Sequence, residues 1–418
     1  MTGCLPLVEP AKDGQGRRIF FVNRYFFPDQ SATSQILGDL AFHLAARGEE
    51  VHVLTSRSSY DDPSAVLPEN AVVEGVKIHR VWTSRLGGRS LFGRLLDYLA
   101  FYIAGSARLF HLVRENDIVV AMTDPPMLSV TAGMIAGLRK FRLVNWIQDL
   151  YPEIAIELGV YWLRGPAGRV LAHLRNRSLR RANMNVVIGK AMEQRLLALG
   201  VDQDRIATIQ NWTDDAELRP LAGENPLRDA WNLRGKFVVG YSGNLGKAHE
   251  VETILAAADL LREQDKFVFL FIGGSRRFSD LQKVCAARNL GNFIFREHQK
   301  RSLLSYSLAV ADVHWLSLRP TLEGLILPSK FYGIAAAGRP IIAIVDPGSE
   351  IAALVTDHAC GAVIAPSNGC QLADVLRALS ESQEARSRMG ANARRMLDEK
   401  FGKSQALARW ENTLETVS

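Results

Sequence analysis

Cysteine is scarce in this chain, and its four copies are scattered. Cys4, Cys285, Cys360 and Cys370 form no Cys-x-x-Cys pair in 418 residues. This spacing excludes a disulfide or zinc framework built on cysteines and favours reduced thiols in a cytoplasmic protein. The nine histidines are scattered too and form no His-Glu-x-x-His motif. We therefore predict that the protein needs no metal and no other cofactor.

A long uncharged hydrophobic run is also missing. The most apolar long window, residues 91–113, contains three charged residues, so we predict no membrane-spanning helix. The first residues include Glu9, Lys12 and Asp13 and no apolar core segment, so we expect no signal peptide. With 47% hydrophobic and 22% charged residues the composition is globular, and the length favours two or more domains.

Basic residues gather in one part of the chain. Residues 81–200 hold 16 Lys and Arg against 8 Asp and Glu. Residues 85–113 and 162–182 place arginines beside apolar residues at helical spacing, which favours a peripheral position on an anionic membrane surface. Core helices with solvated arginines are the alternative. Nucleic-acid binding is disfavoured because no stacking aromatics are interleaved with these arginines. In the second segment the arginines are Arg169, Arg175, Arg177, Arg180 and Arg181.

Short apolar runs alternate with helical patterns along the whole chain, which is typical of α/β domains with parallel sheets. We predict one doubly wound domain over residues 1–205, a second over 206–395 and a terminal helix over 396–418. The expected strands are residues 17–23, 50–56, 76–82, 117–122, 142–150 and 183–189 in the first domain, and 236–243, 266–274, 292–299, 312–318, 339–345 and 361–365 in the second.

Ligands of open parallel sheets bind at the carboxyl ends of the strands. Two such domains that face each other form a cleft with two half-sites, which favours an enzyme with two substrates. In the first domain Asp124, Asp149 and Tyr151 follow strands, and Asp29 and Thr33 lie in the loop before the first helix. We expect these five residues on one side of the cleft, although aspartates at strand ends also often cap loops.

Two corners of the second domain combine small residues with a lysine. Gly243, Gly246 and Lys247 follow a strand and open a helix, which suits a phosphate, although a plain strand–helix turn is the alternative. In the stretch EGLILPSKFYGIAAAGRP, Ser329 starts a helix and Lys330 lies in its first turn. The helix dipole disfavours a cation there unless an anion lies beside it. Together the two corners predict a diphosphate site.

Five segments carry a resemblance to a known family. They are FFPDQSATSQILGDLAFHLAARGEEVHVLTS, QDLYPEIAIELGV, IQNWTDD, GYSGNLGKAHEVETILAAADLL and EGLILPSKFYGIAAAGRPIIAI, and they span both predicted domains. In this order they resemble the family 4 glycosyltransferases, which have the two-domain GT-B fold. Within that family the chain is similar to bacterial enzymes of the WbuB and WcaI type, which build surface polysaccharides.

The resemblance implies transfer of a sugar from a nucleotide-diphosphate donor, UDP-linked in our prediction, with retention of configuration and without a metal. The donor binds the second domain, the first binds a polyprenyl-diphosphate-linked saccharide at the cytoplasmic membrane face, and the last helix crosses back to the first domain. It implies catalytic roles for Lys247, Lys330 and Glu323. The remaining donor-side residues are Gly243, Asn244, Gly246, Gly274, Arg276, His298, Leu327, Pro328 and Ser329.

One position departs from the family pattern. Many relatives carry a glutamate five residues before the glycine of Gly-Arg-Pro, and here that residue is Gly333. The usual ribose contact is therefore absent or replaced. Two rival functions stay open: a nucleotide-sugar 2-epimerase on the same fold, and a nucleotide-sugar-binding protein without turnover.

Overall fold

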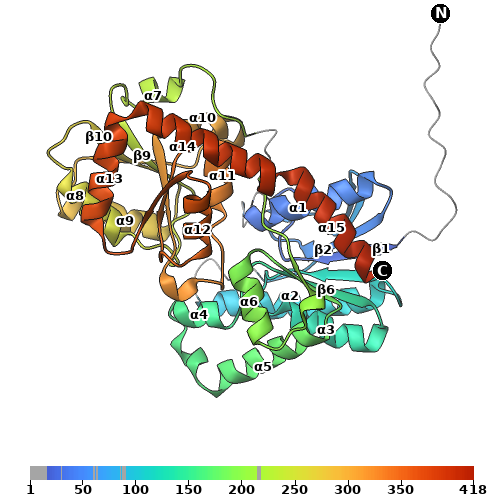
Figure 1. Cartoon of the computed structure of the whole chain (residues 1–418). Helices are drawn as coiled ribbons and strands as arrows, with labels where there is room; N and C mark the ends of the chain where they lie inside the picture. Colours follow the sequence, from blue (N-terminus) through green and yellow to red (C-terminus); the bar gives the residue numbers. More distant parts are fainter. Residues whose placement is uncertain are drawn as a thin grey trace, which may run out of the picture.

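The computed structural model describes residues 17–29, 31–59, 62, 65–84, 86, 91–213 and 218–418, and for Leu91 and Arg276 it describes the backbone only. Two sheets dominate it (Figure 1). The first has the order β3-β4-β2-β1-β5-β6-β7-β8 and is parallel except for the β3–β4 pair. Its strands are β1 (Arg18–Val22), β2 (Glu50–Ser56), β3 (Asn70–Val73), β4 (Val76–Val81), β5 (Ile118–Ala121), β6 (Arg142–Ile147), β7 (Met184–Val187) and β8 (Ile206–Thr208).

The second sheet is parallel throughout, with the order β11-β10-β9-β12-β13-β14. The prediction of two doubly wound α/β domains is therefore confirmed, and the carboxyl ends of both sheets border the space between them. The strands are β9 (Phe237–Ser242), β10 (Phe267–Ile272), β11 (Phe293–Arg296), β12 (Val313–Ser317), β13 (Ile341–Ile344) and β14 (Gly361–Ile364).

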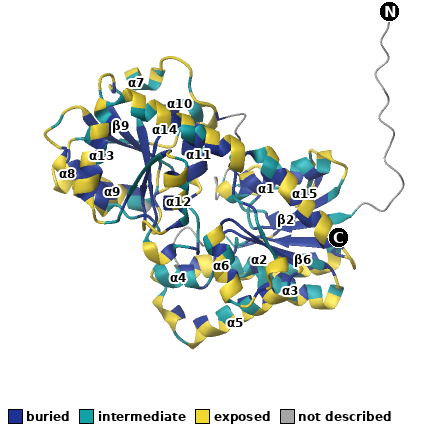
Figure 2. Cartoon of the chain, in the orientation of Figure 1, coloured by how far each residue is buried: buried dark blue, intermediate teal, exposed yellow. Residues whose placement is uncertain are grey.

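Helices cover both sheets, whose central strands are buried (Figure 2). Strands covered on both faces read as continuous apolar runs, which is why the central strands are recognisable in the sequence. The first domain contains α1 (Ala32–Ala46), α2 (Leu91–Leu112), α3 (Leu128–Arg139), α4 (Glu153–Glu157), η1 (Tyr161–Arg164), α5 (Pro166–Arg181), α6 (Lys190–Ala198) and η2 (Gln203–Arg205).

The second domain ends in a long helical run. Its helices are α7 (Pro226–Ala230), α8 (Glu252–Leu260), α9 (Arg276–Ala287), η3 (Arg301–Leu303), α10 (Leu304–Ala309), η4 (Pro320–Leu322), α11 (Lys330–Ala336), α12 (Glu350–Asp357), α13 (Gly369–Glu381), α14 (Gln383–Met396), the π-helical η5 (Leu397–Phe401) and α15 (Lys403–Val417).

Two strands are not predicted from the sequence. One is β3, which forms a hairpin with the predicted strand β4. The hairpin turns at Glu74 and Gly75, which both have positive φ (47° and 81°), the conformation of a type I′ turn. The other, β8, pairs with β7 and begins directly after residue 205. The first domain therefore extends past the boundary predicted at residue 205.

The last helix returns to the first domain, as the fold prediction requires (Figure 1). Trp410 of α15 is fully buried, and its ring lies 4.5 Å from that of Trp146 in β6. Lys403 at the start of α15 forms an ion pair of 2.6 Å with Asp39 of α1. The crossing begins at Gly402 and not at the predicted residue 396, because residues 396–401 still pack in the apolar cluster around α11.

The two domains are also joined next to the cleft. The carboxylate of Glu350 in α12 accepts hydrogen bonds of 3.0 Å from the backbone N–H groups of Lys190 and Ala191, which begin α6 in the other domain. Nearby, the Leu150 N–H donates to the Leu325 carbonyl at 3.0 Å. A carboxylate that accepts from free amides of a helix start stabilises both partners. These contacts hold the strand ends of one domain against those of the other.

One outer layer of the first domain is apolar where it meets solvent. On α2 the exposed residues Phe92, Leu95, Leu99 and Ile103 follow helical spacing and lie on one face. Next to α2 lies α3, and α5 packs beside α3; Figure 2 shows exposed positions along the outer side of both α3 and α5. Exposed apolar residues there are Met134, Leu138, Tyr161, Trp162, Val170 and Leu174.

Arg175 differs from the other arginines of α5. It is 4% exposed and forms an ion pair of 2.6 Å with Glu153, so it does not belong to the predicted membrane-facing set. Arg169, Arg177, Arg180 and Arg181 are exposed. No helix among the described residues is long and apolar enough to cross a membrane.

The burial of Trp410 gives a test of the crossing helix. We expect Trp410→Ala to lower the free energy of unfolding by about 3–5 kcal/mol, because it leaves a large cavity where the ring of Trp410 packs against Trp146 of the first sheet. Asn412→Ala, an exposed change two residues on, is expected to stay within about 0.5 kcal/mol of wild type. Chemical denaturation measures both, and equal values for the two variants would contradict the packing of α15.

Candidate active site

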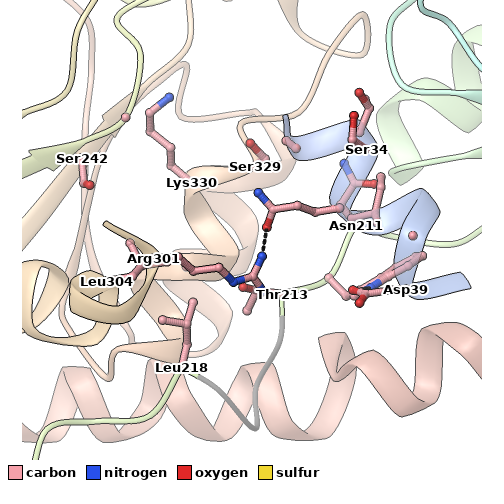
Figure 3. Close-up of a pocket in the computed structure, with 18 of the residues that line it drawn as sticks. Ser34, Asp39, Asn211, Thr213, Leu218, Ser242, Arg301, Leu304, Ser329 and Lys330 are labelled. Atoms are coloured by element: carbon pink, nitrogen blue, oxygen red, sulfur yellow. Dashed lines mark hydrogen bonds between the residues drawn. The ribbon is translucent and has the colours of Figure 1, made fainter. Parts of the chain in front are cut away.

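A cavity of about 730 Å³ lies between the two domains (Figure 3). The start of α1 and the ends of β6 and β8 supply its first-domain side, and the end of β9, the loop after β11, α10 and α11 supply the other. Of the predicted residues, the cavity lining contains Asp29, Thr33, Asp149, Gly243, His298, Leu327, Ser329 and Lys330.

Lys330 has no carboxylate to neutralise it among the described residues. Its Nζ lies 3.3 Å from the carbonyl oxygen of Asn244, 3.4 Å from Nε2 of His249 and 5.1 Å from the ring centre of Tyr241. Burial lowers the pKa of Lys330 to about 8, because a charge with few polar partners is costly away from water. An anion in the cavity would stabilise this ammonium group.

His249 supports Lys330 as a neutral side chain. Its Nδ1 lies 2.9 Å from the Ser317 carbonyl, so Nδ1 carries the proton and donates, which leaves the Nε2 lone pair toward Lys330. Burial, with help from the charge of Lys330, lowers the pKa of His249 to about 4. The pair therefore presents one positive charge at neutral pH.

The loop after β9 fits closely around Lys330. Gly243 has φ 116°, and a Cβ there would lie 2.9 Å from Cε of Lys330, so both conformation and space require glycine. The side chain of Asn244 lies 3.0 Å from Nε2 of His298, which follows β11. The two predicted corners of the second domain, residues 243–247 and 329–330, are thus brought together.

Lys247 reaches toward the other domain. Its Nζ donates to the carbonyl of Leu158 at 3.2 Å, and Leu158 ends α4 of the first domain. Lys247 is exposed and forms no ion pair with a carboxylate of the described chain, so its charge remains available to an anion. Beside it, Arg277 donates to the Gly246 carbonyl at 2.7 Å and adds a further positive charge.

The remaining donor-side predictions have different surroundings. Ser329 is exposed and lines the cavity but makes no capping hydrogen bond, so the expected cap is not formed. Pro328 is buried beneath it. Gly274 packs against the His298 ring, since a Cβ there would lie 3.6 Å from it. Arg276 begins α9, and its side chain lies outside the described part of the structure.

Glu323 is not in the cavity lining. Its carboxylate accepts the N–H of Glu350 at 2.9 Å, and its carbonyl accepts from the Arg195 guanidinium at 2.9 Å. Burial raises the pKa of Glu323, partly opposed by the hydrogen bond from Glu350. Its carbonyl contact with Arg195 joins the domains, and the catalytic role of Glu323 stays a prediction.

On the first-domain side the predicted residues separate into two groups. Asp29 accepts from the Ser59 hydroxyl at 2.5 Å, and with Thr33 and Asp149 it lines the cavity. Asp124 lies behind them, with an oxygen 3.3 Å from Nε of Arg24. The Arg24 guanidinium stacks on the rings of Tyr25 and Tyr98 at 4.3 and 4.8 Å. Tyr151 adjoins this cluster without lining the cavity.

Several cavity residues are not predicted from the sequence. Gln148 and Asn211 exchange amide hydrogen bonds of 3.0 and 2.8 Å. Arg301 donates to Gln35 across the cavity at 3.2 Å, the contact drawn in Figure 3. His249 is missed as well. Gln35, Gln148, Asn211 and His249 lie within the quoted segments, but only the tertiary structure shows which side chains of a segment face inward.

Gly333 lies on the cavity one helical turn after Lys330. A Cβ at Gly333 would meet nothing within 4 Å, so the position has open space. The glutamate carried by many relatives therefore has room here, and its absence widens the cavity beside the lysine.

Comparison with known proteins identifies the family to which this chain belongs. Residues 32–212 match the model described as glycosyl transferase 4-like domain, and residues 224–396 match glycosyl transferases group 1. The chain belongs to the family 4 glycosyltransferases. It is 26% identical over 365 residues to glycosyltransferase WbjE of Pseudomonas aeruginosa, which covers 87% of this chain and 90% of WbjE. To the colanic acid biosynthesis glycosyl transferase WcaI of Escherichia coli K12 it is 27% identical, over 79% of this chain and 83% of WcaI.

Solved structures share the fold of this glycosyltransferase. Sucrose-phosphate synthase of Thermosynechococcus elongatus has a TM-score of 0.73 at 16% identity, covering 96% of this chain and 99% of that one. Anabaena HepE, solved in complex with UDP-glucose, has a TM-score of 0.71 at 15% identity, with 96% and 99% covered. Both structures match both domains, which confirms the predicted GT-B fold. The family models and the relatives confirm the predicted glycosyltransferase class.

Proposed function

We propose that this enzyme transfers a sugar, with retention of configuration, from a UDP-linked donor to a polyprenyl-diphosphate-linked saccharide in surface polysaccharide assembly. The observation that carries the proposal is the un-neutralised Lys330 at the cavity, opposite the carboxylates of the first domain. The relatives support both polysaccharide assembly and a UDP-linked donor, because WcaI is named for colanic acid biosynthesis and HepE is solved with UDP-glucose.

The chemistry follows from charge. When the bond between the sugar and the diphosphate breaks, negative charge develops on the leaving oxygen. Lys247 belongs to the β9–α8 loop, and Lys330 contacts the same loop at the Asn244 carbonyl, so both ammonium groups would stabilise that charge. Since α11 spans only Lys330–Ala336, its dipole adds less than these two ammonium groups. We propose that the lysines take the place of a metal ion and that Asn244 and His298 hold the nucleotide.

A donor panel tests this function directly. Purified enzyme is incubated with UDP-sugars, with and without a phenoxyundecyl-diphosphate-linked monosaccharide, in the presence of EDTA. We expect UDP release and a glycosylated lipid only when the acceptor is present. Conversion of the free UDP-sugar to an epimer would establish the 2-epimerase instead, binding without turnover would establish a binding protein, and rescue by Mg²⁺ or Mn²⁺ would contradict metal independence.

The lysines give a second prediction. We expect Lys330→Ala and Lys247→Ala each to lower kcat by roughly a hundredfold, because one electrostatic contact to a developing oxyanion is worth about 3 kcal/mol. Lys236→Ala, which removes a half-buried lysine before β9 outside the cavity, serves as the matched control and is expected to leave kcat unchanged. A lysine variant with wild-type kcat would remove that lysine from the mechanism.

We also propose that the enzyme lies peripherally on the inner face of the plasma membrane, with the outer layer of α2, α3 and α5 against the lipid. Residues 91–112, 128–139 and 161–181 contain a single acidic residue, the buried Asp97, so the exposed charges of this layer are all positive. An apolar face rimmed by arginines matches an anionic lipid surface. Tyr98 of α2 contacts Arg24, which is paired with Asp124. The lipid end of an acceptor held at this pair would therefore lie next to the outer layer.

Flotation with liposomes tests the membrane face. We expect the double variant Leu99→Glu/Ile103→Glu to lower partitioning onto phosphatidylglycerol liposomes by roughly tenfold or more, because two apolar side chains lose their burial in lipid. Leu260→Glu, an equally exposed leucine on α8 of the second domain, is the control and should partition as wild type. Binding to neutral liposomes should be weaker, and high salt should release the protein. Equal partitioning of wild type and the double variant would contradict this face.

A further inference from the structure

A cluster of polar and aromatic side chains, here called the Arg24 cluster, adjoins the cavity on the first-domain side. It comes from the loops after β1, β5 and β6 and from α2. The three strands are neighbours in the sheet, so their carboxyl ends bring these loops together, and α2 closes the cluster from the outer layer. The cluster consists of Arg24, Tyr25, Tyr98, Asp124, Asp149 and Tyr151.

The Arg24 side chain is held firmly, but most of its hydrogen-bonding capacity is unused. The backbone N–H of Arg24 donates to the Asp124 carbonyl at 2.7 Å, and Nε lies 3.3 Å from a carboxylate oxygen of the same aspartate. The guanidinium is stacked on the rings of Tyr25 and Tyr98 at 4.3 and 4.8 Å. Its two terminal nitrogens have no hydrogen-bond partner among the described residues, although the side chain is only 13% exposed. Both nitrogens are therefore available to oxygen atoms of a ligand.

The carboxylates of the cluster supply acceptors beside these donors. The carboxylate of Asp149 has no hydrogen bond or ion pair within the described chain, and that of Asp124 has only its contact with Arg24. The two lie near each other, since burial and then the charge of Asp124 raise the pKa of Asp149 to about 7. Tyr151 lies beside them, because burial and then the charge of Asp149 raise its pKa. Unused donors, unused acceptors and aromatic rings are thus combined in one place.

This combination matches a saccharide. A sugar hydroxyl both donates and accepts hydrogen bonds, so a guanidinium and a carboxylate side by side satisfy it, while tyrosine rings offer apolar faces to the C–H groups of the sugar. A diphosphate only accepts hydrogen bonds and would lie beside two carboxyl groups, so it fits the cluster poorly. We infer that the Arg24 cluster recognises the sugar of the lipid-linked acceptor, an inference that rests on the proposed function.

The position of the cluster suits such an acceptor. Asp149 lines the cavity that Lys330 faces from the second domain, so a sugar bound at the cluster has one side toward the donor. At the other end, Tyr98 belongs to α2, whose exposed apolar residues form part of the proposed membrane face. The diphosphate and the lipid of the acceptor would then leave the cluster along α2. The enzyme therefore selects its acceptor by the sugar and not by the diphosphate.

Binding of lipid analogues tests this inference without any need for turnover. The probes are phenoxyundecyl diphosphate and the same lipid linked to glucose, galactose or N-acetylglucosamine, each titrated into enzyme saturated with UDP. We expect at least one sugar-bearing lipid to bind wild type roughly tenfold more tightly than the bare lipid, because hydrogen bonds to charged groups form only with the sugar. Arg24→Gln should remove this advantage, while its affinities for UDP and for the bare lipid stay those of wild type.

Two more variants separate recognition of the sugar from loss of folding. Arg18→Gln is the matched control, since Arg18 begins β1, is 14% exposed, pairs with Asp117 and lies over the Phe20 ring, at the end of the strand away from the cavity. It should keep the full advantage of the sugar even if its stability falls. Tyr98→Ala should lower the advantage severalfold, and it decides the matter if Arg24→Gln no longer binds UDP.

Three results would overturn the inference: no sugar-bearing lipid binds wild type better than the bare lipid, the cluster variants keep the advantage, or Arg18→Gln loses it as well. Equal weakening of both kinds of lipid in Arg24→Gln would assign Arg24 to the diphosphate and would also overturn it. If wild type discriminates among these lipids but transfers no sugar to them from any donor, the proposed function fails and the binding result still stands.

Discussion

The contact on which the site depends is that of Lys330 with three uncharged groups: a carbonyl oxygen, a neutral imidazole and an aromatic face. A half-buried ammonium without a carboxylate costs stability unless an anion arrives, which is reflected in its lowered pKa. Two residues of the β9–α8 loop, Gly243 and His249, support this arrangement. Gly243 leaves room for the lysine stem, and the proton on Nδ1 of His249 keeps the other nitrogen as an acceptor. A carboxylate in place of any of these groups would neutralise the charge and remove the reason for an anionic ligand to bind.

The charge is useful only if the second substrate is held opposite to it, and the contacts between the domains do this. Glu350 accepts from the first amides of α6, the Glu323 carbonyl accepts from Arg195, and the Leu150 N–H donates to the Leu325 carbonyl. At the far edge α15 crosses back and buries Trp410 against the first sheet. Two sheets with ordinary nucleotide-binding topology thereby present their strand ends to one cavity.

The sequence predicts the fold well and the site in part, for physical reasons that differ between residues. The central strands are recognisable because burial on both faces makes them apolar throughout, whereas β3 and β8 are short and incompletely buried and are paired with β4 and β7 at the edges of the sheet. Lys330, Gly243 and Asp149 are predicted because a strand end or helix start places them locally. The position of Glu323, the buried pairing of Arg175 and the support from His249 depend on contacts between residues distant in sequence, which local patterns do not encode.

Proton uptake on nucleotide binding tests the central claim about Lys330 most directly. Below the pKa of about 8 the lysine is already protonated, so UDP binding at pH 6.5 should take up almost no proton. At pH 8.5 roughly three quarters of the lysine is neutral, and a diphosphate beside it should restore the charge, giving an uptake of up to about 0.7 proton per UDP. Calorimetric titration in buffers of different ionisation enthalpy measures this number. We expect that uptake in wild type and almost none in Lys330→Met; no uptake at pH 8.5 in wild type would contradict the account.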